Sequence, residues 1–193
     1  MLRVHVSVSL DGYIAGPDVS VERAMGRGGE GLHDWLFADP KDPVDALVAS
    51  EMFSTDTVGA VLMGRRTLEV GLGHWGDDGT FAMPCFVVTH RTHEPIVKES
   101  TTFTFVTAGL EAAVEAASAA AGSKDVNVMG ADLARQLLVG GWVEEVEIDV
   151  VPILLGGGVT LFGGLPPDAL RLEQVSARPS ATVTHLRYRV QGA

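Results

Sequence analysis

The chain has 193 residues, of which 46% are hydrophobic and 20% are charged, and its formal net charge is −11. A domain of this length can bury roughly 70% of the surface that its unfolded chain exposes. The negative charge disfavours nucleic acid and anionic membrane surfaces as partners, because both need a basic face that neutralises phosphate. One anionic small molecule stays compatible with this charge, provided that a few cations cluster locally.

Cysteine usage and hydropathy bear on the compartment. The single cysteine, Cys85, excludes an internal disulfide and any multi-thiolate metal site. No segment reaches the roughly 18–20 apolar residues of a spanning helix, and the alternating start MLRVHVSVSLDGYIAG is not typical of a secretory signal. The six histidines show no metal-ligand spacing, so no metal site is expected. We therefore expect a cytoplasmic chain whose residues 1–193 form one domain.

The N-terminal part predicts a strand, a long loop and a helix. Apolar and polar residues alternate over residues 2–11, which predicts a strand with one apolar and one polar face. Residues 16–34 form a glycine- and charge-rich segment long enough for a lid or binding loop, with a disordered insertion as the alternative. Asp42 and Pro43 then open a helix. Its expected apolar stripe consists of Val44, Leu47, Val48 and Met52.

The remaining elements continue the alternation and then become β-rich. Strands are expected at 57–63, 85–89, 103–107 and 125–129, and helices after residue 64, at 110–121 and from 130 to about 139. A long strand at 143–155, a turn at 156–158 and two strands near 170–177 and 181–190 follow. Alternating β and α elements imply a largely parallel sheet with helices on both faces, and the last two strands should pair antiparallel at one edge.

Ligands bind such sheets at the carboxyl ends of the strands, and three junctions there stand out. In the first, Gly64-Arg65-Arg66-Thr67, glycine permits close backbone approach and two guanidinium groups suit phosphate. Two cations at a helix N-terminus oppose its dipole, and a bound anion would relieve that conflict. An exposed arginine pair that only solubilises the helix is the alternative.

The other two junctions are weaker signals by themselves. Val88 is followed by Thr89-His90-Arg91, which adds a hydroxyl, an imidazole and a guanidinium group after a buried strand. The third junction, Gly130-Ala131-Asp132, joins a strand to a helix through small residues, and its aspartate has the alternative interpretation of a simple N-cap.

Five segments in order carry a family resemblance: SLDGYIAG, MGRRT, VTHR, VMGADLARQLL and VPILLGGGVTLF. Together they resemble the dihydrofolate reductase superfamily, and more closely the reductase domain of the bifunctional riboflavin-biosynthesis deaminase–reductase and its stand-alone relatives. The resemblance extends from Arg3 to Val190. It implies a dihydrofolate reductase-like α/β fold with three α/β/α layers and a mixed, mostly parallel sheet with an antiparallel C-terminal edge.

The resemblance also implies NADPH as cofactor and hydride transfer to a C=N or C=O group of a small heterocyclic or ribosyl-type substrate. Relatives pair through sheet-edge elements, so a homodimer is expected. After Gly64, Arg65 would hold the adenosine 2′-phosphate, and Arg66 and Thr67 the neighbouring phosphates. The adenosine end would be lined by Thr89, His90 and Arg91. The pyrophosphate and nicotinamide ribose would meet Gly130, Ala131, Asp132 and Leu133, and the nicotinamide ring would be bordered by Ile14, Ala15 and Gly16.

Few residues are candidates for the proton donor of the chemical step. Asp11, at the end of the first strand, is the candidate proton donor, and its alternative role is to accept bonds from the Gly12–Ile14 backbone. The acid that folate-reducing members place on their first long helix has no match in motif. Asp34, Asp45 and Glu51 lie in that region.

The physiological substrate stays open at this stage. Val128 and Met129 stand where riboflavin-pathway enzymes tend to carry a glutamate. Two rival functions remain beside the reductase. One is a non-catalytic NADPH-binding sensor or regulatory module, and the other is a different enzyme class that uses the same anion pocket for a nucleotide or a phosphorylated sugar.

Overall fold

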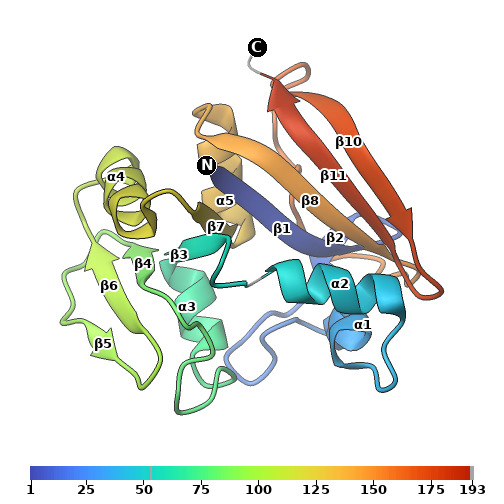
Figure 1. The fold of residues 1–193 in the computed structure, drawn as a ribbon, viewed down its shortest axis with the longest axis horizontal. Coiled ribbons are helices and arrows are strands. Elements are labelled where there is room, and N and C mark those ends of the chain that lie inside the picture. Colours follow the sequence, from blue (N-terminus) through green and yellow to red (C-terminus); the bar gives the residue numbers. More distant parts are fainter. Residues whose placement is uncertain (53, 192–193) are drawn as a thin grey trace.

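The structure is a computed structural model that describes residues 1–52 and 54–191. Its main sheet has the strand order β10-β11-β8-β1-β7-β3-β4-β6-β5 (Figure 1). The strands span Leu2–Ser9 (β1), Val58–Gly64 (β3), Cys85–Val88 (β4), Ile96–Val97 (β5), Thr102–Val106 (β6), Asp125–Met129 (β7), Val143–Val151 (β8), Arg171–Pro179 (β10) and Thr184–Gln191 (β11). A small second sheet pairs β2 (Tyr13–Ala15) with β9 (Val159–Thr160).

Neighbouring strands from β8 through β1, β7, β3 and β4 to β6 are parallel. At one edge β11 runs antiparallel to β8 and β10 antiparallel to β11, and at the other edge β5 runs antiparallel to β6. The predicted mixed, mostly parallel sheet with an antiparallel C-terminal edge is confirmed.

Helices cover both faces of the sheet. They are α1 (Asp34–Phe37), α2 (Pro43–Met52), α3 (Arg65–Gly71), α4 (Leu110–Ala121) and α5 (Ala131–Val139), with a 3₁₀ helix η1 at Gly29–His33. Alternate residues of β3 face opposite layers: Ala60 and Leu62 pack with α4 and α5, whereas Val61 and Met63 pack with α3. The predicted three layers are therefore present. None of the described helices is both long and apolar enough to cross a bilayer.

Several boundaries differ from the sequence prediction. The strand expected at 143–155 ends at Val151, because the chain leaves the sheet before the glycine-rich turn. Residues 16–34, expected as a loop, contain η1 and the start of α1. The short strands β2, β5 and β9 were not predicted, since two- and three-residue strands leave little periodicity to detect.

The buried face of α2 also differs from the expected stripe. Leu47 is 50% exposed, whereas Asp45 is fully buried. Asp45 takes this position because its carboxylate accepts a hydrogen bond from His185 Nε2 over 2.9 Å. A helix with an aspartate on its inner face has only a weak apolar stripe, which explains why Leu47 was wrongly predicted to be buried.

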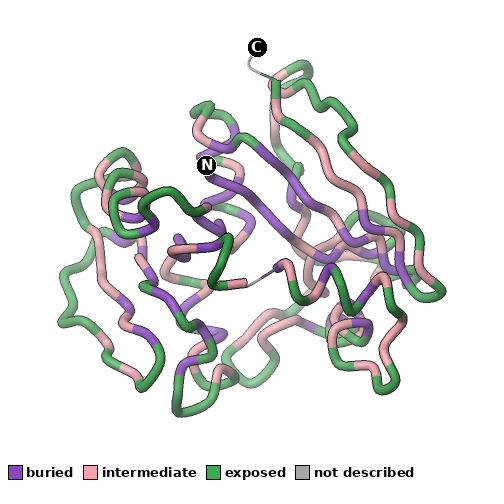
Figure 2. Tube along the Cα trace, in the orientation of Figure 1, coloured by how far each residue is buried: buried purple, intermediate pink, exposed green. Residues whose placement is uncertain are grey.

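The polar face of β1 faces α1 and α2 and is buried, as the purple trace in Figure 2 shows for this strand. Trp35 Nε1 donates to Ser7 Oγ over 3.0 Å, and His5 Nε2 lies 2.9 Å from Asp149 Oδ2. Asp149 also contacts His185 Nδ1 over 2.6 Å. These pairs satisfy polar groups that would otherwise be costly to bury. We call Asp45, Asp149, His5 and His185 the buried His–Asp cluster.

Candidate functional site

The sheet order brings the three predicted junctions to one edge. β1 lies beside β7, β7 beside β3, and β3 beside β4, all in parallel register. The carboxyl ends of these strands therefore meet at the same edge, and Gly64 pairs directly with Val88. We call this the carboxyl edge.

The β3–α3 and β7–α5 junctions touch each other. Gly130 has a φ of +96°, and a Cβ added there would lie only 2.2 Å from Thr67 Oγ1. The same two junctions also meet at Gly64, where an added Cβ would lie 3.8 Å from Leu133 Cβ. The backbone conformation therefore favours glycine at position 130, and any larger residue there would also need the Thr67 hydroxyl to move.

Three arginines follow the paired strands β3 and β4, and one of them forms an ion pair with a carboxylate of α3. Arg65 Nε donates to Glu69 Oε1 over 2.6 Å. This hydrogen bond is the main reason why the pKa of Glu69 is lowered; burial is the next-largest cause and raises the pKa, and the charges of Arg65, Arg66 and Arg91 lower it further. Arg66 also donates to the carbonyl oxygen of Val19 over 2.7 Å. The arginines predicted from two separate junctions therefore follow adjacent strands at the carboxyl edge.

In the segment after β4, the residue that contacts Arg65 of α3 is His93 and not the predicted His90. Thr89 is buried, and its Oγ1 accepts a hydrogen bond from the Arg91 backbone N–H over 3.1 Å. His90 is exposed. His93 instead contacts Arg65, with 2.5 Å between His93 Nε2 and Arg65 Nη1, and its ring packs 4.9 Å from that of Phe105.

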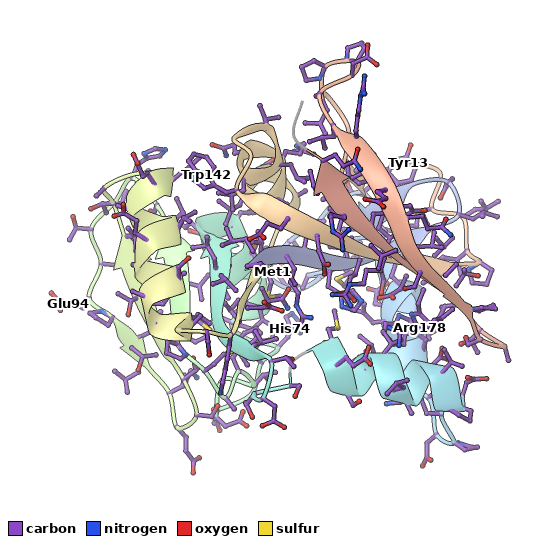
Figure 3. The ribbon with its side chains drawn as sticks, turned by 45° about the horizontal axis from the view of Figure 1, so that its top comes forward. Met1, Tyr13, His74, Glu94, Trp142 and Arg178 are labelled. Carbon is purple, nitrogen blue, oxygen red and sulfur yellow. The ribbon has the colours of Figure 1, made fainter. Side chains whose placement is uncertain are left out.

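Sequence reasoning missed Glu69 and His93. The spacing of Glu69 four residues after Arg65 on a helix was an available signal for an ion pair. His93 gave no such local signal, because its contact with Arg65 spans 28 positions and depends on β3 and β4 being neighbours. Figure 3 labels Glu94, the next residue, at the outer edge of the molecule.

The predicted nicotinamide-side segment, Ile14 to Gly16, lies at the end of β1 in close backbone packing. A Cβ on Gly158 would lie 2.1 Å from the Ala15 carbonyl oxygen, and one on Gly16 would lie 2.2 Å from that of Arg27. β2 and β9 pair across this contact, with Tyr13, labelled in Figure 3, opposite Thr160. The glycine-rich turn after β8 therefore holds this segment in place.

Asp11 is an anchor for the chain after β8. Its carboxylate accepts hydrogen bonds from Ser9 Oγ over 2.6 Å and from the Gly156 N–H over 2.7 Å. The Leu155 N–H donates to it as well, over 3.1 Å. The hydrogen bond from Ser9 is the largest cause of its lowered pKa, followed by that from Gly156. This favours the structural role, although the partners are Leu155 and Gly156 rather than the Gly12–Ile14 backbone.

Asp132 is not the N-cap of α5, contrary to the alternative considered for it. The N-cap is Gly130, and Asp132 lies in the first turn, where its carboxylate pairs with Arg135. Arg135 also donates to the Thr160 carbonyl oxygen over 2.7 Å. The start of α5 is thereby tied to β9.

Two of the acids near the first long helix, Asp45 and Glu51, are engaged elsewhere. Asp45 bonds to His185, and Glu51 pairs with Arg178 over 2.9 Å. Arg178, labelled in Figure 3, lies on β10. A groove of about 600 Å³ near this pair is lined by Arg3 at the start of β1 and Asp125 at the start of β7. It lies at the amino ends of the strands, away from the carboxyl edge.

The donor set of the carboxyl edge fits a phosphate-bearing dinucleotide. Arginine guanidinium groups are planar, permanently charged donors that match phosphate oxygens. Arg65 and Glu69 are 29% and 44% exposed, so both are accessible to a ligand. Within residues 1–52 and 54–191, no group of three or more histidine, cysteine or acidic residues is arranged to hold a metal ion.

Three solved structures share this fold. A protein of Shewanella sp. PV-4 described as a riboflavin biosynthesis protein is 25% identical over 98% of each chain, with a TM-score of 0.75. Dihydrofolate reductase from Enterococcus faecalis, complexed with NADP(H), is 15% identical over 99% of this chain and 96% of its own, with a TM-score of 0.58. These likenesses define the fold as dihydrofolate reductase-like.

The Thermotoga maritima diaminohydroxyphosphoribosylaminopyrimidine deaminase/5-amino-6-(5-phosphoribosylamino)uracil reductase is 13% identical, with a TM-score of 0.64. It matches 99% of this chain through 56% of its own length. The family model of the RibD C-terminal domain matches residues 1–186, and the chain belongs to that family. No curated protein matches the chain. Membership of this family supports an oxidoreductase.

Proposed function

We propose that this protein is an NADPH-dependent reductase that transfers hydride to a C=N or C=O group of a small heterocyclic or ribosyl-type substrate. The observation that carries the proposal is the placement of Arg65, Arg66 and Arg91 directly after the paired strands β3 and β4, at the carboxyl edge of the sheet. An acidic protein that gathers three guanidinium groups at the ligand-binding edge of its sheet has a local site for a multiply charged anion.

The proposed roles follow the geometry of the carboxyl edge. Arg65 and Arg91 would bind the adenosine 2′-phosphate, and Arg66 the neighbouring phosphates after release from the Val19 carbonyl. The Gly130–Leu133 turn would offer its backbone N–H groups to the pyrophosphate, since it lies against Thr67. When bound, the reduced nicotinamide supplies the hydride. Ile14, Ala15 and Gly16 would border its ring.

A dinucleotide titration tests this proposal. Thermal unfolding is measured with NADPH, with NADH and without ligand. A ligand at about 100 times its dissociation constant stabilises the folded state by roughly 2.7 kcal/mol, which raises the unfolding temperature by several degrees. We expect NADPH to protect at lower concentration than NADH. If both fail to protect while a nucleotide or sugar phosphate does, the rival enzyme class with the same anion pocket is favoured.

A second candidate is a sensor that binds NADPH without catalysis. The Asp11 carboxylate accepts hydrogen bonds from Ser9, Leu155 and Gly156, which favours this candidate because a carboxylate that acts as an acceptor for three donors is a poor proton donor. Turnover separates the two functions: NADPH oxidation with a panel of cyclic imines and ribosyl ketones supports the reductase. Tight NADPH binding with no turnover on that panel supports the sensor.

A homodimer stays a prediction of the family resemblance. β10 is an edge strand on which Leu172 and Val175 are 39% and 44% exposed. Exposed apolar residues on a sheet edge favour association with a second chain. Sedimentation at several concentrations measures the oligomeric state.

A further inference from the structure

The carboxyl edge contains an acid and an imidazole that the family-based site does not include. Glu69 lies one turn after Arg65 on α3, and His93 lies in the segment between β4 and β5. Both contact the guanidinium group of Arg65, through Nε and Nη1 respectively. Arg65 is thus held from two sides by residues that are distant from each other in sequence.

The two contacts of Arg65 differ in kind. A guanidinium group has donors and no acceptor, so His93 Nε2 accepts the hydrogen bond from Nη1 and the imidazole is held in one tautomer. Packing of the His93 ring against Phe105 fixes its orientation. His93 therefore directs the guanidinium plane and adds no charge in this arrangement. Glu69 contributes a full negative charge on the opposite side.

The Glu69 contact is one that a ligand can exchange. The pair is separated by four residues on a helix and is partly exposed, which makes it a weak interaction. A phosphate ester competes well for the same guanidinium group, because it offers more charge and several acceptor oxygens. Once displaced, however, the Glu69 carboxylate stays near the bound dianion and repels it. An unphosphorylated ribose has no such conflict.

We propose that Glu69 and His93 set the dinucleotide specificity of this site: Glu69 is a resident anion that a 2′-phosphate must displace from Arg65, and His93 orients Arg65 for that phosphate. This inference rests on the proposed NADPH site and extends it to two residues outside the recognised motifs. Glu69 accordingly weakens the preference for NADPH over NADH, and His93 strengthens it.

The test measures dissociation constants of NADPH and NADH for the wild-type protein and for Glu69→Gln. The amide keeps the size of the side chain and removes its charge. We expect NADPH to bind about tenfold more tightly to Glu69→Gln, as loss of one like-charge repulsion near a partly exposed dianion predicts. NADH should bind with unchanged affinity. Adenosine 2′-monophosphate, compared with adenosine 5′-monophosphate, isolates the phosphate subsite and should show the same gain.

Glu144→Gln is the matched control. Glu144 is exposed at the amino end of β8, so its substitution changes the net charge equally at a distance from the site. A similar gain in Glu144→Gln would assign the effect to overall charge and overturn the proposal. Equal changes for NADPH and NADH in Glu69→Gln would overturn it too, while leaving the NADPH site itself intact. Failure of the wild-type protein to bind either dinucleotide would overturn the proposed function as well.

His93 is tested by rescue. His93→Ala should weaken NADPH binding about threefold to tenfold, as expected for one lost hydrogen bond, and leave NADH binding unchanged. His93→Gln retains an acceptor and should restore most of the affinity. The effect should fall on KM for NADPH and not on kcat, because His93 orients Arg65 and does not touch the reacting atoms. Equal losses in both variants, or a loss for NADH as well, would contradict an orienting role.

Discussion

Two charged clusters of this protein use similar side chains in opposite ways. At the carboxyl edge, Arg65 and Glu69 are 29% and 44% exposed, and their pair is open to competition from a ligand. In the buried His–Asp cluster, His185 and Asp149 are 4% and 1% exposed, and both ring nitrogens of His185 contact carboxylates. The first arrangement is exchangeable, and the second is fixed by burial.

The difference in burial determines what each cluster can do. Desolvation makes an unpaired buried charge costly, so the His–Asp cluster holds α2 to β8 and β11 with little freedom to exchange partners. Solvent screens the exposed Arg65–Glu69 pair at the carboxyl edge, so separating its two charges costs little free energy. A binding site for a charged ligand requires an exposed ion pair that can separate, and a clamp between layers requires a buried pair that cannot.

The largest effect should come from breaking the buried cluster. Asp149→Ala removes the carboxylate that joins His5 and His185, so that His5 Nε2 and His185 Nδ1 lose their hydrogen-bond acceptor while His185 keeps Asp45. Loss of one partner from a buried ion pair typically costs about 3–5 kcal/mol of stability. Urea denaturation of the wild type and the variant measures the free energy of unfolding.

An exposed pair on the neighbouring strands is the control for that prediction. Glu173 and Arg189 lie 3.6 Å apart and are 51% and 57% exposed. Glu173→Ala should change the free energy of unfolding by only about 0–1 kcal/mol. Comparable losses in Asp149→Ala and Glu173→Ala would contradict the contrast between the two clusters.

The next effect concerns the exchangeable cluster. Arg65→Ala removes the guanidinium group shared by Glu69 and His93, and should lower NADPH affinity by about tenfold to a hundredfold, the range for one charge-assisted hydrogen bond. NADH affinity should change little, so the preference for NADPH disappears. Titrations with both dinucleotides measure the ratio. Arg189→Ala, on an exposed part of β11, is the charge control, and an unchanged ratio in Arg65→Ala would reject the assignment.

Sequence patterns were sufficient for the elements that position the carboxyl edge. Glycine and charge at Gly64-Arg65, and small residues at Gly130-Ala131, marked strand-to-helix junctions, and both helices begin there. Parallel order then placed these junctions side by side. The resemblance supplied the fold, which the structure and its relatives confirm, whereas the assigned roles of the site residues stay predictions.

Contacts between distant segments could not be predicted in the same way. His93 reaches Arg65 only because β3 pairs with β4, and Asp45 is buried only because His185 lies beneath α2 on β11. The polar face of β1 likewise resembled a solvent-facing side by alternation alone. Its burial depends on a layer of charged partners from β8 and α2, which a periodicity argument does not include.

Stability should depend on pH through the buried cluster. Burial lowers the pKa of His185, but hydrogen bonds to Asp149 and Asp45 outweigh it, so its pKa is raised overall. A group with a raised folded pKa contributes its full stability below its unfolded pKa, near 6.5, and loses it as pH rises through the folded value. Burial raises the pKa of Asp149, but hydrogen bonds to His185 and His5 lower it overall, so its contribution is lost as pH falls below about 3.8.

Thermal unfolding between pH 4 and pH 10 measures this dependence. We expect the highest unfolding temperature in the mildly acidic range and a decline on the alkaline side. His185→Asn, which cannot carry the charge, should lower stability at acidic pH and flatten the alkaline decline. An equally steep decline in the variant would show that other groups cause it.

The smallest effect is expected at Asp11, which combines features of both clusters: its carboxylate is exposed like Glu69, yet committed to fixed partners like Asp149. Asp11→Asn weakens the bonds from Ser9, Leu155 and Gly156 and should lower the unfolding temperature slightly. If Asp11 only anchors the turn after β8, kcat falls modestly and the pH profile of kcat keeps its shape. If Asp11 donates the proton, the variant loses the limb of that profile that reports the acid. The lowered pKa of Asp11, caused first by the Ser9 hydrogen bond, favours the unchanged profile.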